Sequence, residues 1–249
     1  TYVYNLGDGH DIIYDQATGD SESSVKDTIL FGAGITAADL RFANVPDFWN
    51  DISIGIAGAA GSIRIRNQSD NKTGIEAINF ADGSSWTLEQ LKARYVLDQQ
   101  TIGHDRVHGT ETTDSISSGA GNDVIIAGAG DDVIAGGTGN DYFEGAWGAD
   151  TYVYNLGDGH DIIYDQATSN SESSVKDTIV FGAGITAADV FIEPDRWNNA
   201  SNLLIRFGSQ PGSILVLGQS DNRTGIEPIQ FSDGPVWDAA DIDAEFAVG

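Results

Sequence analysis

The sequence of 249 residues contains no cysteine, so disulfide bonds and thiolate metal sites are excluded. Methionine is also absent, and we expect the chain to be a segment or a processed product of a longer protein. No apolar run approaches the ~20 residues of a membrane-spanning helix. Basic residues are scarce, since 12 Lys and Arg stand against 38 Asp and Glu, and the net charge is −26. Such a surface repels nucleic acid and anionic membranes, so we expect neither a nucleic-acid partner nor membrane insertion.

Much of the sequence is present twice. Residues 1–40 and 151–190 differ only at the pairs 19/169, 20/170, 30/180 and 40/190, and similarity returns between 63–83 and 214–234. The offset between the copies is about 150 residues, which is the mark of a repeat architecture. We therefore expect the chain to be a slice of a longer tandem array.

Between the two copies, an aspartate recurs every nine residues. Glycines occupy the second and fourth places of the three units from Ser118 to Glu144, while the unit at 145 keeps only the fourth-place glycine. An apolar residue follows the aspartate in the eighth place of all five units. The aspartates are Asp114, Asp123, Asp132, Asp141 and Asp150; the glycines are Gly119, Gly121, Gly128, Gly130, Gly137, Gly139 and Gly148. Glycine permits positive φ and close backbone approach, so each unit predicts a six-residue turn followed by a short strand.

Two such units make one coil of a roll, so each aspartate is expected to stack on the aspartate two units away. The expected pairs are Asp114 with Asp132, Asp123 with Asp141, and Asp132 with Asp150. Asp141 would pair with a longer unit that offers either Asp158 or Asp161.

Carboxylates stacked about one strand spacing apart, ~4.8 Å, repel each other unless a cation lies between them. From Gly109 to Asp165 the sequence has eleven acidic residues and no Lys or Arg, so no side chain there can supply that cation. Ligands that are all oxygen select a hard ion of the size of Ca²⁺. The sequence therefore predicts several bound Ca²⁺ ions in this stretch.

The flanking copies are rich in short alternating apolar runs with the periodicity of strands, such as 52–56, 62–66 and 76–80. Hydrophobic residues make up 40% of the chain, which is enough to bury a core. Leu88–Val96 is expected to be a helix that covers the end of the roll, with Thr87 as N-cap and Gln90 as its capping-box partner. A second helix is expected from Asp238 onwards.

The unit GGTGNDYFE at 136–144 resembles the GGxGxDxUx nonapeptide of RTX (haemolysin-type) calcium-binding repeats. The units beginning at Ser118 and Ala127 are similar, and the flanking copies resemble the RTX-associated segment of large secreted adhesins. The resemblance implies a mainly β fold: a right-handed parallel β-roll flanked by irregular β segments with short capping helices. It divides the chain into an associated segment at 1–102 whose upstream roll is missing, a roll at 103–165, and a second associated segment at 166–249.

The resemblance also implies Ca²⁺ ligands and a location. The ligand role is carried onto the five aspartates of the nonapeptides, onto Asp161 or Asp158, and onto Asp11, the copy of Asp161, while the turn glycines would supply carbonyl oxygens. Export by a type I machine to the bacterial surface or exterior is implied as well. Within that class, we expect a structural extender without catalytic residues that folds when Ca²⁺ binds.

Other interpretations stay open at this point. Asp8, Asp11 and Asp15 can equally be turn residues. The histidines at 10, 104, 108 and 160 lack metal-site spacing, and Trp49, Trp86, Trp197 and Trp237 are expected to pack rather than to bind sugars. The chain could also be the accessory roll of a secreted enzyme, or a module that binds a glycan or another cell-surface ligand through Phe48, Trp49 or Trp197.

Overall fold

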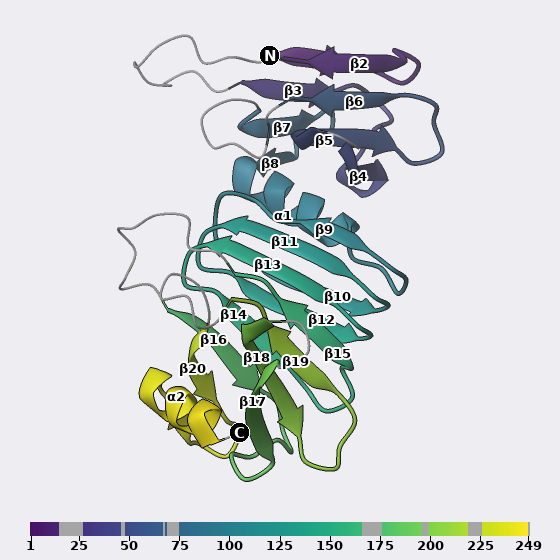
Figure 1. The fold of residues 1–249 in the computed structure, drawn as a ribbon. Helices are drawn as coiled ribbons and strands as arrows, with labels where there is room; N and C mark the ends of the chain where they lie inside the picture. Colours follow the sequence, from purple (N-terminus) through teal and green to yellow (C-terminus); the bar gives the residue numbers. More distant parts are fainter. Residues whose placement is uncertain are drawn as a thin grey trace, which may run out of the picture. The chain divides into compact units, whose positions relative to one another are not determined.

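The computed structural model describes residues 1–14, 27–45, 48–66, 68, 75–165, 176–195, 199–218 and 226–248, except for the side chains of 48–50, 199–200 and 246–248. They fall into two compact units, Thr1–Gln99 and Gln100–Gly249. In both units, short strands are stacked one above the next, as Figure 1 shows. Neither helix of the described residues is long and apolar enough to cross a membrane.

Unit 1 contains two four-stranded sheets and one α-helix. One sheet has the order β1-β3-β7-β8 and the other β2-β6-β5-β4. The elements are β1 (Tyr2–Tyr4), β2 (His10–Ile13), β3 (Thr28–Phe31), the 3₁₀ turn η1 (Ala37–Asp39), β4 (Leu40–Val45), β5 (Phe48–Ile56), β6 (Ser62–Ile65), β7 (Ala77–Phe80), β8 (Ser85–Thr87) and α1 (Leu88–Asp98). The strands β1, β3 and β7 run parallel, as do β2 and β6, whereas β4, β5 and β8 pair antiparallel.

Unit 2 begins with the nonapeptides and builds two larger sheets. Their orders are β10-β12-β14-β16-β20-β21 and β17-β18-β19-β15-β13-β11-β9. The first strands are β9 (Arg106–His108), β10 (Ser115–Ala120), β11 (Val124–Ala129), β12 (Val133–Thr138), β13 (Tyr142–Trp147), β14 (Thr151–Tyr154), β15 (His160–Ile163) and β16 (Asp177–Phe181). The others are β17 (Val190–Asp195), β18 (Asn199–Phe207), β19 (Ser213–Val216), β20 (Ile226–Gln230) and β21 (Val236–Trp237), followed by α2 (Ala239–Val248).

Successive nonapeptide strands alternate between the two sheets, so each sheet receives every second unit. Ile116 pairs in parallel with Ile134, and Ile134 with Tyr152, while Ile125 pairs with Phe143 in the opposite sheet. All five of these eighth-place side chains are at most 3% exposed. The strands β10–β13 are six residues long and bury two residues each, so the strands are longer and the turns shorter than predicted. The parallel pairing of every second unit closes a β-roll, and the predicted mainly β fold is confirmed.

The second copy continues this roll without a break in pairing. β14 pairs in parallel with β16, β15 with β19, and β16 with β20, while the hairpin β17–β18 is added at the edge. Within unit 2, strands of the second copy therefore extend the roll. The finer boundaries expected near residues 102 and 165 stay predictions.

Both predicted helices are present and lie at equivalent places. In α1, the Thr87 hydroxyl accepts from the Gln90 amide at 3.3 Å, and Gln90 Oε1 accepts from the Thr87 amide at 2.9 Å, which is the expected capping box. α1 contacts β4 and β8, the last strands of the two sheets of unit 1, and α2 contacts β17 and β21, the last strands in unit 2. Each helix therefore covers strand edges that would otherwise invite pairing with another chain.

Two of the four recurring tryptophans pack as expected. Trp86 lies 5.8 Å from Phe80 between ring centroids, and Trp237 lies 4.8 Å from Phe231. The side chains of Phe48, Trp49 and Trp197, on which the glycan-binding hypothesis depends, lie outside the described residues, as does Asp15.

Candidate metal centre

The nonapeptide aspartates form two ladders, one in front of the strands of each sheet. In the first ladder, the backbone amide of each aspartate donates to the Oδ1 atom of the aspartate in the next coil. The distances are 2.8 Å from Asp105 to Asp123, 2.8 Å from Asp123 to Asp141 and 3.0 Å from Asp141 to Asp161. The longer unit therefore contributes Asp161 to the ladder.

The second ladder follows the same rule and runs further than the nonapeptides do. Asp114 donates to Asp132 at 2.7 Å, Asp132 to Asp150 at 2.9 Å and Asp150 to Asp177 at 2.9 Å. Asp177 in turn donates to Glu227 Oε2 at 2.9 Å. The three aspartate pairs expected from the eighteen-residue step are thus all brought together, and the ladder continues into the second copy.

In four of the ladder aspartates, Oδ1 accepts a hydrogen bond from this amide, while Oδ2 has no partner. The Oδ2 atoms of Asp123, Asp132, Asp141 and Asp150 are buried and accept no hydrogen bond. These four residues are at most 2% exposed. A buried carboxylate oxygen without a partner is costly, so it indicates a ligand at that place.

Burial raises the pKa of four ladder carboxyl groups, those of Asp132, Asp141, Asp150 and Asp161, chiefly because desolvation disfavours the charged form. In the chain without metal the pKa is raised to about 8 for Asp132 and Asp161, to about 7 for Asp150 and to about 6 for Asp141. The amide donors lower these values and neighbouring carboxylates raise them. Negative charge on these buried carboxyl groups is therefore unfavourable unless a proton or a cation neutralises it.

The turn glycines allow the coils to stack at this spacing. Gly139 has φ +149°, and a Cβ atom placed on it would lie 1.6 Å from the carbonyl oxygen of Gly121 in the neighbouring coil. The other second- and fourth-place glycines also have positive φ and similar contacts: Gly119, Gly121, Gly128, Gly130, Gly137 and Gly148. Ala146 is the exception in sequence but not in conformation, since its φ is 77°. That the carbonyl groups of these glycines bind metal stays a prediction.

A third set of side chains forms hydrogen bonds between the turns of neighbouring coils. The residue before each ladder aspartate accepts a hydrogen bond from the backbone of the next coil: Asn122 from the Asn140 amide at 2.9 Å, and Asn140 from the His160 amide at 3.0 Å. His104 Nδ1 takes the same place at the first coil and accepts from the Asn122 amide at 2.6 Å. The His104 side chain therefore stabilises a turn, whereas His160 contributes its backbone amide.

The first units of the run differ from the rest in how their aspartates are satisfied. Asp114 Oδ2 accepts from the amide of Thr110 at 2.6 Å and from its hydroxyl at 2.9 Å. Asp105 also accepts from Thr101, on Oδ2 from the backbone amide and on Oδ1 from the hydroxyl. In these first units, threonine therefore donates hydrogen bonds to the aspartate. The four Oδ2 atoms without a partner belong to units further along the chain.

The donor set fits a hard divalent cation. The open atoms are carboxylate oxygens, and none of the ion pairs of the described residues involves a ladder aspartate: they are Arg64–Asp51, Arg94–Asp98 and Arg206–Glu193. A Ca²⁺ ion takes six to eight oxygen ligands at about 2.3–2.6 Å. The orphaned oxygens of Asp123, Asp132, Asp141 and Asp150 are therefore the atoms best placed to hold it.

Two of the predicted ligands lie elsewhere. Asp158 is buried, but its Oδ2 atom accepts from the amide of Asn155 at 2.6 Å, so it closes the longer turn instead of joining a ladder. Asp11, the copy of Asp161, lies on the edge strand β2 and is exposed. Neither residue accepts the ladder hydrogen bond that Asp161 accepts, and the ligand role of both stays a prediction.

The sequence analysis missed three ladder residues, Asp105, Asp177 and Glu227, and one buried aspartate near the second ladder, Asp165. Asp105 precedes Asp114 by nine residues, so an extension of the period would have found it. Asp177 precedes Thr178 and an aliphatic residue, just as Asp150 precedes Thr151 and Tyr152. Asp165 and Glu227 carry no such signal, because the spacing between coils is irregular there.

The comparisons with known proteins agree with this geometry. Residues 101–134, 118–152 and 126–163 match the model of the RTX calcium-binding nonapeptide repeat, which contains four copies. Residues 51–90 match the haemolysin-type calcium binding protein related domain. No curated protein gives a significant match.

Among solved structures, the chain is similar to the extracellular lipase LipA from Serratia marcescens, at 15% identity and a TM-score of 0.35. The match covers 87% of this chain and 33% of the lipase, so the chain spans about a third of that protein's length.

Fold and ladders together define a calcium-binding β-roll. The chain contains RTX calcium-binding nonapeptide repeats within residues 101–163, and its residues 51–90 match the related haemolysin-type domain.

Proposed function

We propose that this chain is a module that folds on binding Ca²⁺ outside the cell and acts as a spacer in a large secreted or surface-attached protein. The observation that supports this most directly is the set of four buried Oδ2 atoms, on Asp123, Asp132, Asp141 and Asp150, that have no hydrogen-bond partner.

Those oxygens make the folded roll dependent on metal. Moving a carboxylate out of water costs several kcal/mol even after relaxation, on the order of the whole stability of a domain. The eleven acidic residues from Gly109 to Asp165 have no Lys or Arg among them to offset this cost. A bound ion removes the repulsion between coils, so its binding free energy becomes folding free energy.

The same dependence suits export. Extracellular calcium modules have dissociation constants of about 10⁻⁴–10⁻³ M, so a cytosol poor in Ca²⁺ leaves them empty while millimolar Ca²⁺ outside fills them. The glycine-rich run would then pass an export channel unfolded and close by mass action after release.

The spacer role follows from the duplication. The two units repeat the same order of elements, from β1 to α1 and from β14 to α2, at an offset of about 150 residues. Long copies of similar sequence build length with regular spacing, and a helix closes the strand edges of each copy. The roll itself contributes structure and calcium binding, and we place no catalytic step in it.

A calcium titration followed by circular dichroism tests the proposal. The chain in EDTA is expected to lose most of its β signal from the roll and to regain it cooperatively with Ca²⁺ in the range of about 10⁻⁴–10⁻³ M. Magnesium at the same concentration is the control, because it keeps its water and demands octahedral geometry. A β spectrum that is the same in EDTA and in Ca²⁺ would refute calcium-driven folding.

A further inference from the structure

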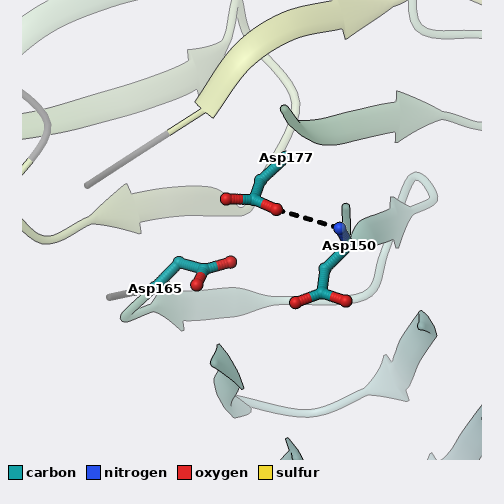
Figure 2. Close-up of side chains that lie close together, drawn as sticks. All are labelled: Asp150, Asp165 and Asp177. Carbon is teal, nitrogen blue, oxygen red and sulfur yellow. Dashed lines mark hydrogen bonds between the residues drawn. The ribbon is translucent and has the colours of Figure 1, made fainter. Parts of the chain in front are cut away.

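Three aspartates gather where the nonapeptide roll passes into the second copy. Asp150, Asp165 and Asp177 each place a carboxylate oxygen within 4.8 Å of the other two, and Figure 2 shows the three side chains converging. Asp150 precedes β14, Asp165 follows β15, and Asp177 begins β16. Residues from three successive strands of the roll therefore meet at one point.

Two of the three lie beyond the residues that match the nonapeptide repeats, which end at 163. The strand pairing shows which places they take. Tyr152 pairs with Ile179, so Asp177 stands two residues before an inward side chain, as each ladder aspartate does. Phe143 pairs with Ile163, so Asp165 stands in the first place of the next turn, which is glycine in the units at Gly136 and Gly145.

Each carboxylate of the cluster is held through one oxygen. Asp165 Oδ2 accepts from the Tyr152 hydroxyl at 2.5 Å, and Asp150 Oδ1 accepts from the Asp132 amide at 2.9 Å. Asp177 Oδ1 accepts from the Asp150 amide at 2.9 Å. The side chains are therefore fixed in position by groups that do not neutralise them.

The remaining oxygens are the second, independent sign of a ligand. Asp165 Oδ1 and Asp150 Oδ2 are buried and have no hydrogen-bond partner. The residues are 1% and 0% exposed, and Asp177 is 9% exposed. Among the residues that the structure describes, no Lys, Arg or His forms an ion pair with any of the three. In their charged form, three buried carboxylates in such proximity repel one another, and a cation of more than single charge would stabilise them.

We propose that Asp150, Asp165 and Asp177 bind one Ca²⁺ ion that is additional to those of the nonapeptide turns. The donors are all oxygen, which excludes the softer metals and leaves a hard divalent ion, with backbone carbonyls and water completing its six to eight ligands. The inference deepens the proposed function, since Asp150 also belongs to the second ladder. Its consequence is that the second copy, from β16 onwards, is tied to the roll by calcium and folds with it.

Counting bound ions tests the proposal. The whole chain is dialysed to equilibrium against Ca²⁺ and the bound metal is measured, for the wild type and for the variants Asp165→Asn and Asp177→Asn. Both variants are expected to bind one ion fewer per chain at millimolar Ca²⁺, or to bind that ion at least tenfold more weakly. Asn at 165 keeps the size of the side chain and an acceptor for the Tyr152 hydroxyl, so the local packing is retained.

Asp189→Asn is the matched control. This aspartate lies in the same unit but is exposed, and its carboxylate accepts only from Thr186 in the structure. It is expected to bind the wild-type number of ions. Asp165→Asn with full stoichiometry and unchanged affinity would overturn the additional site, even if the proposed function stands. A wild-type chain that binds no Ca²⁺ would instead refute the proposed function. If Asp177→Asn fails to fold in saturating Ca²⁺, the ion count for Asp165→Asn alone decides whether the additional site exists.

Discussion

The amide of Asp141 donates to Oδ1 of Asp161 at 3.0 Å across twenty residues, whereas the step between the complete nonapeptides is eighteen. The two additional residues are absorbed in a turn that Asp158 closes by accepting from the Asn155 amide. The ladder therefore tolerates an insertion as long as the aspartate that precedes the strand keeps its place.

Asp161→Asn is expected to weaken Ca²⁺ binding at the end of the first ladder by at least tenfold, which is about 1.4 kcal/mol. The reason is that Asp161 is 3% exposed and stacked on Asp141, so its charge is part of the metal-binding set. Isothermal titration with Ca²⁺ measures the change.

Asp11→Asn provides the control in an identical local sequence. Residues 1–14 and 151–164 have the same sequence, but Asp11 is exposed on the edge strand β2. We expect no change in the affinity of the nonapeptide sites. An equal loss for both variants would show that the effect comes from net charge and not from the ladder.

The raised pKa values predict how stability depends on pH without metal. The pKa of Asp132, Asp161 and Asp177 is raised from 3.8 to about 8 in the folded chain, mainly by burial. Between about pH 4 and 8 the folded roll therefore binds more protons than the unfolded chain, and its stability falls as the pH rises through this window. Circular dichroism in EDTA is expected to show more ordered β structure at pH 5 than at pH 8.5.

The opposite dependence is expected for calcium, because protons and Ca²⁺ compete for the same carboxylates. Affinity measured by titration should fall as the pH is lowered from 8.5 to 5.5. A calcium affinity that is independent of pH over this range would contradict the assignment of the buried ladder aspartates as ligands.

The roll could be predicted closely from the sequence because its signals are local and repeated. A period of nine residues fixes the turn, the ladder position and the inward residue, so the pairs Asp123–Asp141 and Asp132–Asp150 and the core position of Phe143 all follow from counting. The capping box at Thr87 and Gln90 is local too, and the helix α1 begins at Leu88 as predicted.

What the sequence did not reveal depends on pairing over irregular distances. The amide of Asp150 donates a hydrogen bond to Asp177, which lies twenty-seven residues further along the chain. The amide of Asp177 donates to Glu227, fifty residues further along. No period connects these residues, and only the strand register places Asp165 and Asp177 beside Asp150. The choice between Asp158 and Asp161 was open for the same reason, since the insertion breaks the count.

Gly139→Ala is expected to destabilise the calcium-loaded roll strongly. A Cβ atom there lies 1.6 Å from the Gly121 carbonyl oxygen, so neighbouring coils must move apart, in addition to the cost of positive φ. We expect a loss of roughly 3 kcal/mol, from about 1–2 for the backbone and about 1–3 for overpacking. Thermal unfolding in saturating Ca²⁺ measures it.

Gly157→Ala separates the backbone cost of positive φ from the cost of overpacking between coils. Gly157 has φ +98° in the same unit, but a Cβ atom there has nothing within 4 Å. Only the backbone cost of about 1–2 kcal/mol should remain. Equal destabilisation by the two substitutions would show that close stacking of the coils does not limit the fold.

Ala146→Gly is expected to stabilise the roll, in contrast to most substitutions that introduce glycine. Ala146 is the one non-glycine residue with positive φ among the described residues, at 77°, and it occupies the second place of a unit where the preceding three have Gly119, Gly128 and Gly137. Removing its Cβ relieves strain of about 1–2 kcal/mol, from which the greater freedom of glycine in the unfolded chain subtracts about 0.4–1 kcal/mol. A net gain of roughly 0.5–1 kcal/mol should therefore appear in thermal unfolding with saturating Ca²⁺. Ala129→Gly is the control, because Ala129 lies in β11 without positive φ and should lose about 0.5–1 kcal/mol. A loss at both positions would mean that the turn at Ala146 does not carry the strain that its φ implies.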